Sequence, residues 1–436
     1  MKENRNLKYF GLFCILVLAL IIIGFEYPQA QARAMAKPPP ASPPLPSLMI
    51  GDIISAESDA LKVWRYSFSE PLWTKKTESN YYTQVAIGDV DSDSKSEIAV
   101  PVAKAVSKGK VDEFKIFIEV YKEGFATPVS SENYSPGYFT DPSTVICDVM
   151  MANVIPESGF QINEIVLQHW YNLVIFKWDG TNFRIVKRIQ ARYKDLPVVA
   201  YNGTTTKNID TDPEEEIFVS GQDTYSGTGY IYEIDMDQNA GYQIMLISST
   251  KDCSVTNILI GHRLRVAGLD GDVDLEICLP GWVEKKVGDI STWQAYLLIL
   301  DKNQEGNWQW AYAIIPGYET AKNVHPEIDL DTGELDVTIG EEIALYVNQQ
   351  PESDYWLYLF SYTSNLSQCQ LVRANAINDI KIGIISSENK IVVCGTAPPL
   401  KGKNWRKYFE VFSYPGASFW QVFGESGSIT DLGIFK

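Results

Sequence analysis

The stretch IGDVDSDSKSEIAV, residues 87–100, places carboxylates on alternate positions. Asp89, Asp91 and Asp93 occupy positions 1, 3 and 5 of a turn, and Glu97 follows at position 9, where an apolar strand begins. Lys95 at position 7 offers only its backbone carbonyl. Oxygen atoms at this spacing can wrap a hard cation such as Ca²⁺, which takes roughly six to eight oxygen ligands. The stretch therefore predicts a calcium turn, provided that the fold holds these oxygens together.

Related acidic turns occur further along the chain. They comprise Asn208, Asp210, Asp212, Glu214 and Glu216; Asp270, Asp272, Asp274 and Glu276 after Gly268; and a longer, less regular set of Glu327, Asp329, Asp331 and Glu342. Without a cation, carboxylates gathered in one turn repel one another. The alternative is a solvated acidic turn that only keeps the connection soluble.

An EF-hand is excluded by position 6 and by the last acidic position. An EF-hand loop needs Gly at position 6 and Glu at position 12, between two helices. Position 6 here is Ser94, Pro213 or Val273, and the acidic residue falls at position 9 and leads into a strand. The turns must therefore connect strands.

The elements around these turns recur along the chain. Strand starts of the type EIAV occur at Glu97, Glu164, Glu216, Glu276, Glu342 and, as KIVV, Lys390, about 59 residues apart on average. A repeat of this length is typical of solenoids and propellers. Each repeat contains a short strand, the turn, the EIxV strand, an aromatic-rich strand and a more polar strand, and four strands make one blade of a β-propeller.

The two ends of the chain predict how the ring closes. Residues 428–436 resemble a first strand that no second strand follows, whereas residues 48–57, 60–68 and 71–76 supply three strands without a first. Joining them adds one blade to the six internal repeats. The prediction is an all-β fold, a seven-bladed β-propeller whose last blade combines N- and C-terminal strands, and closure removes exposed sheet edges. Six blades with a separate flap is the alternative.

The repeats resemble the FG-GAP or VCBS-type propeller repeats of integrin α-chains, whose signature is roughly GDxDxDGxxD between two strands. IGDVDSDSKSEIAV is the closest match, and NIDTDPEEEIFV and GLDGDVDLEICL follow. The resemblance runs from about residue 50 to the end. It implies a calcium-stabilised propeller outside the cytoplasm that serves in adhesion, ligand binding or scaffolding. The chain departs from the signature by lacking Gly at position 6 and by having Glu in place of the final Asp.

The N-terminal residues predict export. Residues 1–32 combine a basic start, a 16-residue apolar run (residues 10–25) and AQA before a cleavage point, which is typical of a signal peptide, with a membrane anchor or tether as the alternative. Residues 33–47 include KPPPASPPLP, an extended Pro-rich linker. The propeller then occupies residues 48–436, and we expect an extracytoplasmic protein that is secreted, periplasmic or on the cell surface.

The net charge and the aromatic residues of the loops restrict the classes of partner that the protein can bind. A net charge of −18 argues against nucleic acid as a partner, because phosphate binding needs Lys and Arg. The loops opposite the acidic turns carry Tyr225, Trp282, Trp293 and Trp405, which predicts contacts with a protein or carbohydrate partner on that face. The alternatives are a propeller-based polysaccharide lyase or hydrolase and an envelope scaffold. Clustered Asp, Arg, Lys or Tyr at the central channel would favour an enzyme.

Overall fold

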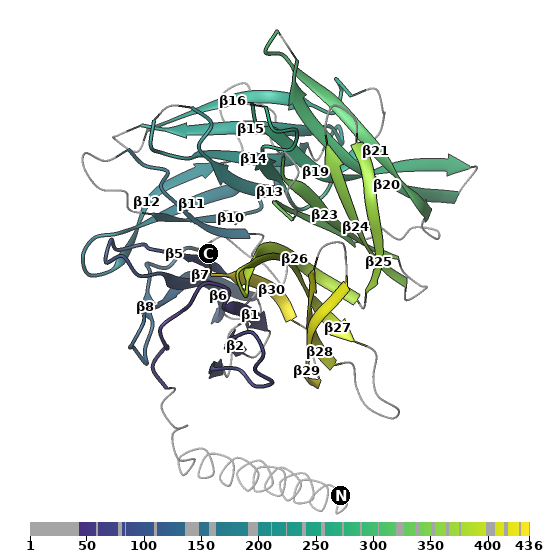
Figure 1. Ribbon diagram of the computed structural model, residues 1–436. Helices are drawn as coiled ribbons and strands as arrows, with labels where there is room; N and C mark the ends of the chain where they lie inside the picture. Colours follow the sequence, from purple (N-terminus) through teal and green to yellow (C-terminus); the bar gives the residue numbers. More distant parts are fainter. Residues whose placement is uncertain are drawn as a thin grey trace, which may run out of the picture. The chain divides into compact units, whose positions relative to one another are not determined.

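The computed structural model of the chain is built from strands and turns, and its described residues contain no helix (Figure 1). The chain divides into Met1–Ser42 and Pro43–Lys436. The structure describes residues 43–435 apart from 58–59, 77–80, 83, 109–110, 136–147, 157–162, 191–198, 211, 224, 238–240, 254–257, 273, 288–289, 304, 320–326, 336–339, 350–353, 363–365, 375, 398–405, 414–416 and 427–428.

The predicted export segment, residues 1–32, and most of the Pro-rich linker lie outside the described residues. Within the part of the chain that is described, no helix has the length and apolarity to cross a membrane.

The described strands form seven antiparallel sheets, each of which is one blade. Blade one consists of β4 (Tyr81–Tyr82), β5 (Ala86–Gly88), β6 (Glu97–Lys108), β7 (Val111–Tyr121) and β8 (Val129–Ser130). Blade two consists of β9 (Asp148–Ala152), β10 (Glu164–His169), β11 (Asn172–Trp178) and β12 (Phe183–Gln190). Blade three consists of β13 (Val199–Lys207), β14 (Glu216–Asp223), β15 (Gly229–Met236) and β16 (Tyr242–Ser249).

The remaining blades follow in chain order. Blade four consists of β17 (Ile258–Ile260), β18 (Arg265–Ala267), β19 (Glu276–Val287), β20 (Ile290–Lys302) and β21 (Trp308–Glu319); blade five of β22 (Glu327–Gly333), β23 (Glu342–Gln349), β24 (Asp354–Tyr362) and β25 (Leu366–Ala374); blade six of β26 (Ala376–Ile385), β27 (Glu388–Ala397), β28 (Arg406–Ser413) and β29 (Ala417–Ser426); and blade seven of β30 (Ile429–Ile434), β1 (Ile53–Glu57), β2 (Ala60–Trp64) and β3 (Trp73–Lys76).

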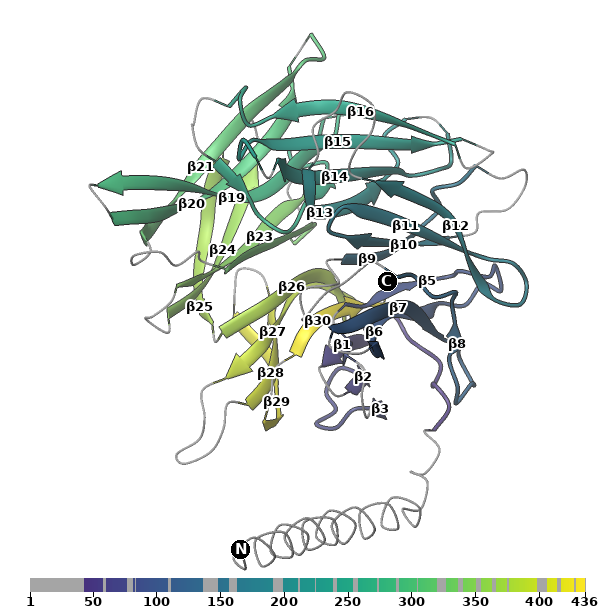
Figure 2. The same ribbon diagram turned by 180° about the vertical axis from the view of Figure 1, so that it is seen from behind.

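Blade seven confirms the predicted closure. The C-terminal strand β30 is its first strand and pairs antiparallel with β1, with Ile434 opposite Ile53 and Leu432 opposite Ser55. Both views show β30 beside β1 (Figures 1 and 2). The two ends of the domain are therefore held in one sheet, and the chain is a seven-bladed β-propeller.

The core consists of seven apolar layers, each between two neighbouring blades. The layer between blades seven and one, for example, joins Ile54 and Val63 to Ile98 and Val100, all of them fully buried. Since every blade is covered on both faces, its middle strands carry apolar residues on both sides, as in β10, where the consecutive residues Ile165, Val166 and Leu167 are all fully buried. Burial of each such side chain stabilises the fold by about 1.5–3 kcal/mol.

Two faces of the ring can be defined by their turns. We call the face with the turns from the first to the second strand of each blade the acidic-turn face, because residues 89–96 and the described residues of 208–215 and 268–275 lie there. The turns from the second to the third strand form the opposite face. First strands line the centre of the ring and run toward the acidic-turn face.

Candidate functional site

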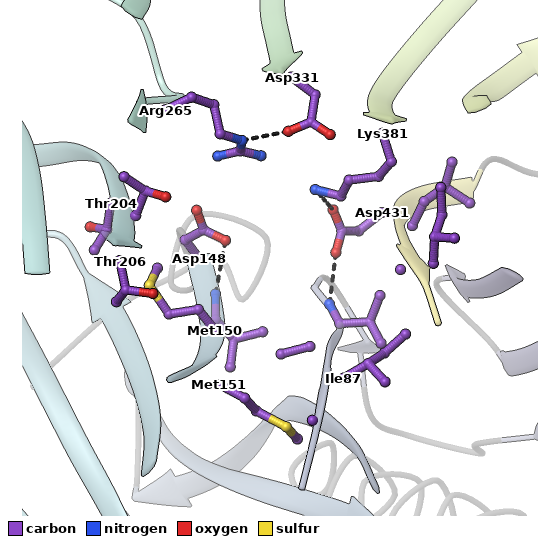
Figure 3. Close-up of a pocket in the computed structure, with 18 of the residues that line it drawn as sticks. Ile87, Asp148, Met150, Met151, Thr204, Thr206, Arg265, Asp331, Lys381 and Asp431 are labelled. Carbon is purple, nitrogen blue, oxygen red and sulfur yellow. Dashed lines mark hydrogen bonds and ion pairs between the residues drawn. The ribbon is translucent and has the colours of Figure 1, made fainter. Parts of the chain in front are cut away.

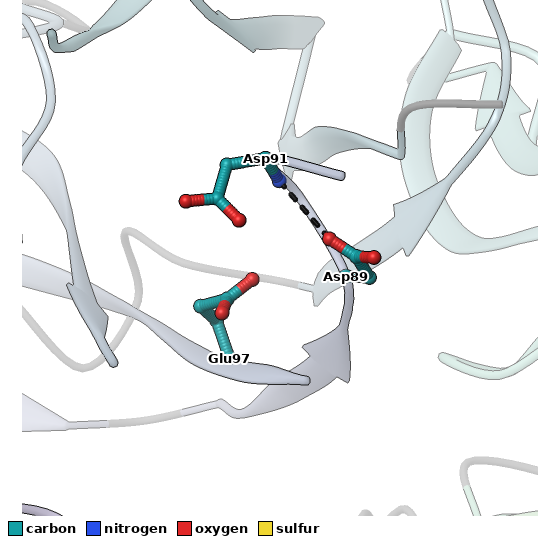
Figure 4. Close-up of side chains that lie close together, drawn as sticks. All are labelled: Asp89, Asp91 and Glu97. Carbon is teal, nitrogen blue, oxygen red and sulfur yellow. Dashed lines mark hydrogen bonds between the residues drawn. The ribbon is translucent and has the colours of Figure 1, made fainter. Parts of the chain in front are cut away.

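Three turns on the acidic-turn face bring carboxylates together. Each combines two aspartates with the glutamate that begins the second strand, and their ligand atoms all lie within 4.8 Å of one another. Figure 4 shows the first of them. The three groups are Asp89, Asp91 and Glu97; Asp210, Asp212 and Glu216; and Asp270, Asp272 and Glu276. The residues that could hold a metal ion thus recur at one place in blades one, three and four.

The backbone of the first turn wraps around Asp89. Its carboxylate accepts hydrogen bonds from the backbone N–H groups of Asp91, Ser92 and Ser94, at 3.3, 2.7 and 2.9 Å. Ser92 and Ser94 have φ angles of 62° and 65°, in the left-handed region. A non-glycine residue in this region costs roughly 1–2 kcal/mol. Ser94 therefore keeps the glycine-type conformation at an energetic cost.

The glutamate at position 9 is buried at the end of each turn. Glu97, Glu216 and Glu276 are at most 4% exposed, and each accepts a hydrogen bond from the backbone N–H seven residues upstream, at 3.0, 2.9 and 2.6 Å. Burial raises the pKa of all three side chains to about 7, and the neighbouring aspartates add to the rise. The turns therefore concentrate negative charge that no hydrogen bond fully compensates.

Glu276 has a buried oxygen without a partner among the described residues. Its Oε2 accepts from the Leu269 N–H, whereas its Oε1 is buried and has no hydrogen-bond partner among the described residues. Asp270 and Asp272 approach the same point. A cation at this point would satisfy the buried oxygen and neutralise the repulsion.

Other predicted ligands lie in the same turns but outside the three compact groups. Asp93 accepts from the Lys95 N–H at 2.9 Å, and the Lys95 side chain pairs with Glu123 at 3.5 Å. Asp274 lies 3.4 Å from the Lys302 ammonium. Asn208 and Glu214 also form hydrogen bonds within their turn: the Asn208 amide donates to the Asp212 carbonyl, and the Glu214 N–H donates to the Asp212 carboxylate.

The prediction for blade five was wrong in its placement. Glu327, Asp329 and Asp331 do not lie in a loop with Glu342 but within the first strand, β22. Asp329 and Asp331 form ion pairs with arginines of blade four in the central channel. Glu342 begins β23 and accepts from the Leu335 N–H at 2.7 Å, as its equivalents do in the other blades.

A buried ionic cluster crosses the central channel and was not predicted. The side chain of Arg263, 9% exposed, pairs at 3.1–3.2 Å with four aspartates from four different blades. These aspartates are Asp148, Asp329, Asp379 and Asp431. One guanidinium thus connects blade four to blades two, five, six and seven.

The aspartates of the channel also join neighbouring first strands. Asp331 accepts from the Ile382 N–H of blade six at 2.7 Å, and Asp379 accepts from the Leu432 N–H of blade seven at 2.8 Å. Asp431 accepts from the Val85 N–H of blade one at 2.7 Å. Each carboxylate therefore accepts a hydrogen bond from a backbone N–H group of the next blade.

The charges of the cluster depend on one another. Burial raises the pKa of Asp431 well above its usual range and that of Asp329 to about 7. Burial opposes the ionisation of Asp379 too, but Lys381 and Arg263 outweigh it and hold the pKa of Asp379 low. Burial works against the charge of Arg263, yet the four carboxylates raise its pKa well above the ordinary value. The arginine therefore stays charged in the channel.

The sequence does contain a signal for this cluster. Four first strands carry Asp before an apolar residue, as CDV, IDL, NDI and TDL at Asp148, Asp329, Asp379 and Asp431. An acidic residue at the same place in apolar strands indicates a shared buried partner. Arg263 lies in the connection before β18, outside any repeated pattern.

Comparisons with known proteins give only distant likenesses. No protein-family model matches the chain, and no curated protein matches it. Among solved structures, it is similar to the Nup133 β-propeller domain of Vanderwaltozyma polyspora (11% identity, 80% of this chain and 90% of that one, TM-score 0.42). It is also similar to a functionally unknown protein of Desulfotomaculum acetoxidans (12%, 88% and 98%, 0.44) and to an α-L-arabinanase of Penicillium chrysogenum (10%, 80% and 94%, 0.43). At such identities each likeness concerns the fold alone.

Proposed function

We propose that the chain is an exported propeller that holds calcium in the turns of blades one, three and four and serves as a binding or adhesion module. The observation that supports it is the recurrence of three compact carboxylate groups at one place in three blades. Chance could supply one such turn, but repetition in register with the blades indicates a common ligand. The apolar N-terminal run supports export, so that the protein would be secreted, periplasmic or on the cell surface.

The donor set favours calcium among biological cations. The three groups offer carboxylate oxygens and no cysteine or histidine, whereas zinc and copper prefer nitrogen and sulfur. Magnesium demands near-ideal octahedral geometry and keeps its waters, while calcium accepts flexible loops with several carboxylates. Bound calcium would act as a structural staple, because each turn joins the first two strands of a blade.

The opposite face offers aromatic side chains to a partner. Tyr225 is 93% exposed in the turn of blade three, and Trp170 and Tyr171 are 38% and 37% exposed in the turn of blade two. The two turns belong to neighbouring blades, and the Tyr201 N–H of blade three donates to the Trp170 carbonyl. We propose that this aromatic patch, Trp170, Tyr171 and Tyr225, contacts a protein or carbohydrate partner.

Two aromatic side chains that the sequence predicted for this surface belong to the core instead. Trp282 lies in β19 and is 6% exposed, and Trp293 lies in β20, half-buried against the same core layer. Trp405 lies outside the described residues. The patch therefore keeps Tyr225 and gains Trp170 and Tyr171.

A second candidate function is that of a polysaccharide-active enzyme. Clustered acidic and basic side chains in the channel favour it, because Asp331, Asp431, Arg265 and Lys381 line one cavity. Release of reducing ends or unsaturated products from neutral polysaccharides, lost in Asp331→Asn, would support this alternative. Binding of the same polymers without turnover would exclude it.

Calcium titration by calorimetry tests the main proposal. We expect three binding events in chelator-treated protein, and two in each of the variants Asp91→Asn, Asp210→Asn and Asp272→Asn. Asp252→Asn is the matched control, since Asp252 is an exposed aspartate outside the three groups. No heat of binding in the wild type, or an equal loss in the control, would refute the proposal.

A further inference from the structure

The central channel contains a cavity that opens on the acidic-turn face. Its volume is about 610 Å³, within the range of roughly 300–1,000 Å³ that is typical of small-molecule sites. First strands line its depth, and residues at the start of second strands, such as Ser96 and Glu341, line its mouth. The cavity therefore lies on the other side of the ring from the aromatic patch.

The ionic cluster forms the inner end of this cavity. Arg263, Asp329 and Asp379 each precede by two residues a side chain of the cavity wall, namely Arg265, Asp331 and Lys381. Two residues of a strand span about 6–7 Å. Arg263 thus crosses the channel at one level, and the side chains of the next level remain available to a ligand.

The walls combine hydrogen-bond donors and acceptors (Figure 3). Arg265 bonds Asp331 through Nε at 2.5 Å and the Leu264 carbonyl through Nη1 at 2.9 Å, which leaves its Nη2 for a ligand. Lys381 forms long ion pairs with Asp379 and Asp431, at 3.6 and 4.0 Å, and its ammonium also lines the cavity.

The remainder of the wall supplies a hydroxyl group and an apolar surface. Thr206 lies beside Met150, and Met151 and Ile87 continue the wall (Figure 3). The neighbouring Thr204 is buried, and its hydroxyl donates to Gln168 at 2.6 Å. A ligand that fits this wall needs polar groups on its edge and an apolar face.

The charge balance decides between neutral and charged ligands. Among the described residues, four cationic side chains that line the cavity face five acidic ones: Lys207, Arg263, Arg265 and Lys381 against Asp89, Asp148, Asp331, Glu341 and Asp431. An anion would meet an excess of carboxylates, and a cation would have to displace the arginine and lysine ion pairs. Hydroxyl groups suit both partners, because each can donate to a carboxylate and accept from a guanidinium or ammonium.

We propose that the channel cavity binds a neutral mono- or disaccharide. Its hydroxyls would bond Arg265, Lys381 and Thr206, and its C–H face would pack against Met150 and Met151. The proposal requires neither calcium in the acidic turns nor a partner on the aromatic patch, so it can fail while the proposed function stands.

Binding of defined sugars by the whole protein tests the proposal. Neutral hexoses, pentoses and their dimers are titrated by calorimetry and by saturation-transfer NMR, with a uronic acid and an amino sugar as charged comparators. We expect at least one neutral sugar to bind, and neither comparator to bind more tightly than it.

Two cavity variants and one control locate the site. Thr206→Val removes one hydroxyl from the wall and should weaken binding roughly three- to tenfold, the worth of one hydrogen bond. Met151→Trp fills the cavity and should abolish binding. Thr181→Val, the same change in an exposed turn of blade two, should leave binding intact. Melting curves verify that each variant is folded.

Three results would overturn the proposal. They are no binding by any neutral sugar, tighter binding of the uronic acid or amino sugar, and unchanged affinity in folded Thr206→Val and Met151→Trp. Calcium titration of the same samples separates this failure from failure of the proposed function.

Discussion

Replacing Arg263 tests how the channel holds the ring together. Arg263→Met removes the cation that pairs with all four of Asp148, Asp329, Asp379 and Asp431 and leaves their charges buried, with Lys381 still near the last two. Breaking a buried ion pair by removing one partner costs about 3–5 kcal/mol. With an unfolding entropy of about 2.1 cal/mol/K per residue, a propeller of this size should melt roughly 4–6 °C lower.

The pH dependence of this variant identifies the cause. Without the guanidinium, the four aspartates should have raised pKa values, so the folded state should bind protons more tightly than the unfolded chain. Stability of Arg263→Met should then be largest in acid and be lost as pH rises through those raised values. The difference from the wild type should accordingly shrink between pH 8 and pH 5.

The assay is thermal and guanidinium unfolding followed by circular dichroism. Arg184→Met is the matched control, because Arg184 also pairs with two acids, Glu132 and Asp179, but its side chain is 50% exposed. Exposed pairs of this kind contribute little, and we expect almost no change in melting temperature. An Arg263→Met protein that melts like the wild type, or one whose loss does not depend on pH, would refute the reasoning.

Two further predictions concern closure and the acidic turns. Deleting residues 428–436 removes β30 and should abolish cooperative unfolding near the native temperature; a truncated protein that melts like the intact one would contradict the closure by β1 and β30. In chelator, the pKa values of Glu97, Glu216 and Glu276, raised to about 7, should make the protein more stable at pH 5 than at pH 8, with stability lost as pH rises through about 7. Melting curves across this range check it, and a stability that rises with pH would contradict it.

The fold was predictable because its signals are local and repeated. The EIAV-type starts mark the second strands of blades one to five, KIVV lies in that of blade six, and the unpaired strand at the C-terminus matches the three at the N-terminus. Such a pattern specifies blades without any knowledge of side-chain contacts. The three compact acidic groups were predicted for the same reason, since all their ligands lie within one turn.

Blade five shows why the local pattern can mislead. Carboxylates on alternate residues suit a calcium turn, but alternation is also the period of a strand. At Asp329 and Asp331 the intervening residues are Ile328 and Leu330, which point the other way into apolar layers. In blade five both residues between the acids are apolar, whereas blade one has Ser92 and Ser94 after a single apolar residue, Val90.

The channel cluster could not be predicted because its contacts are long-range. Arg263 meets Asp431, 168 residues away in the sequence, only after the ring has closed. A sequence pattern shows that first strands carry aspartates, but it does not show which cation reaches them. The aromatic patch has a similar limit: Trp282 lies within the long strand β19 and is buried, whereas Trp170 follows the short strand β10 and is exposed.

Thermal unfolding with and without calcium tests the central claim most directly. Each occupied turn should stabilise the native state by about 2.7 kcal/mol when free calcium is 100 times the dissociation constant. Chelator should therefore lower the melting temperature by several degrees, calcium should restore it, and Asp272→Asn should recover less than the wild type. A melting temperature that neither chelator nor added calcium changes would contradict the account.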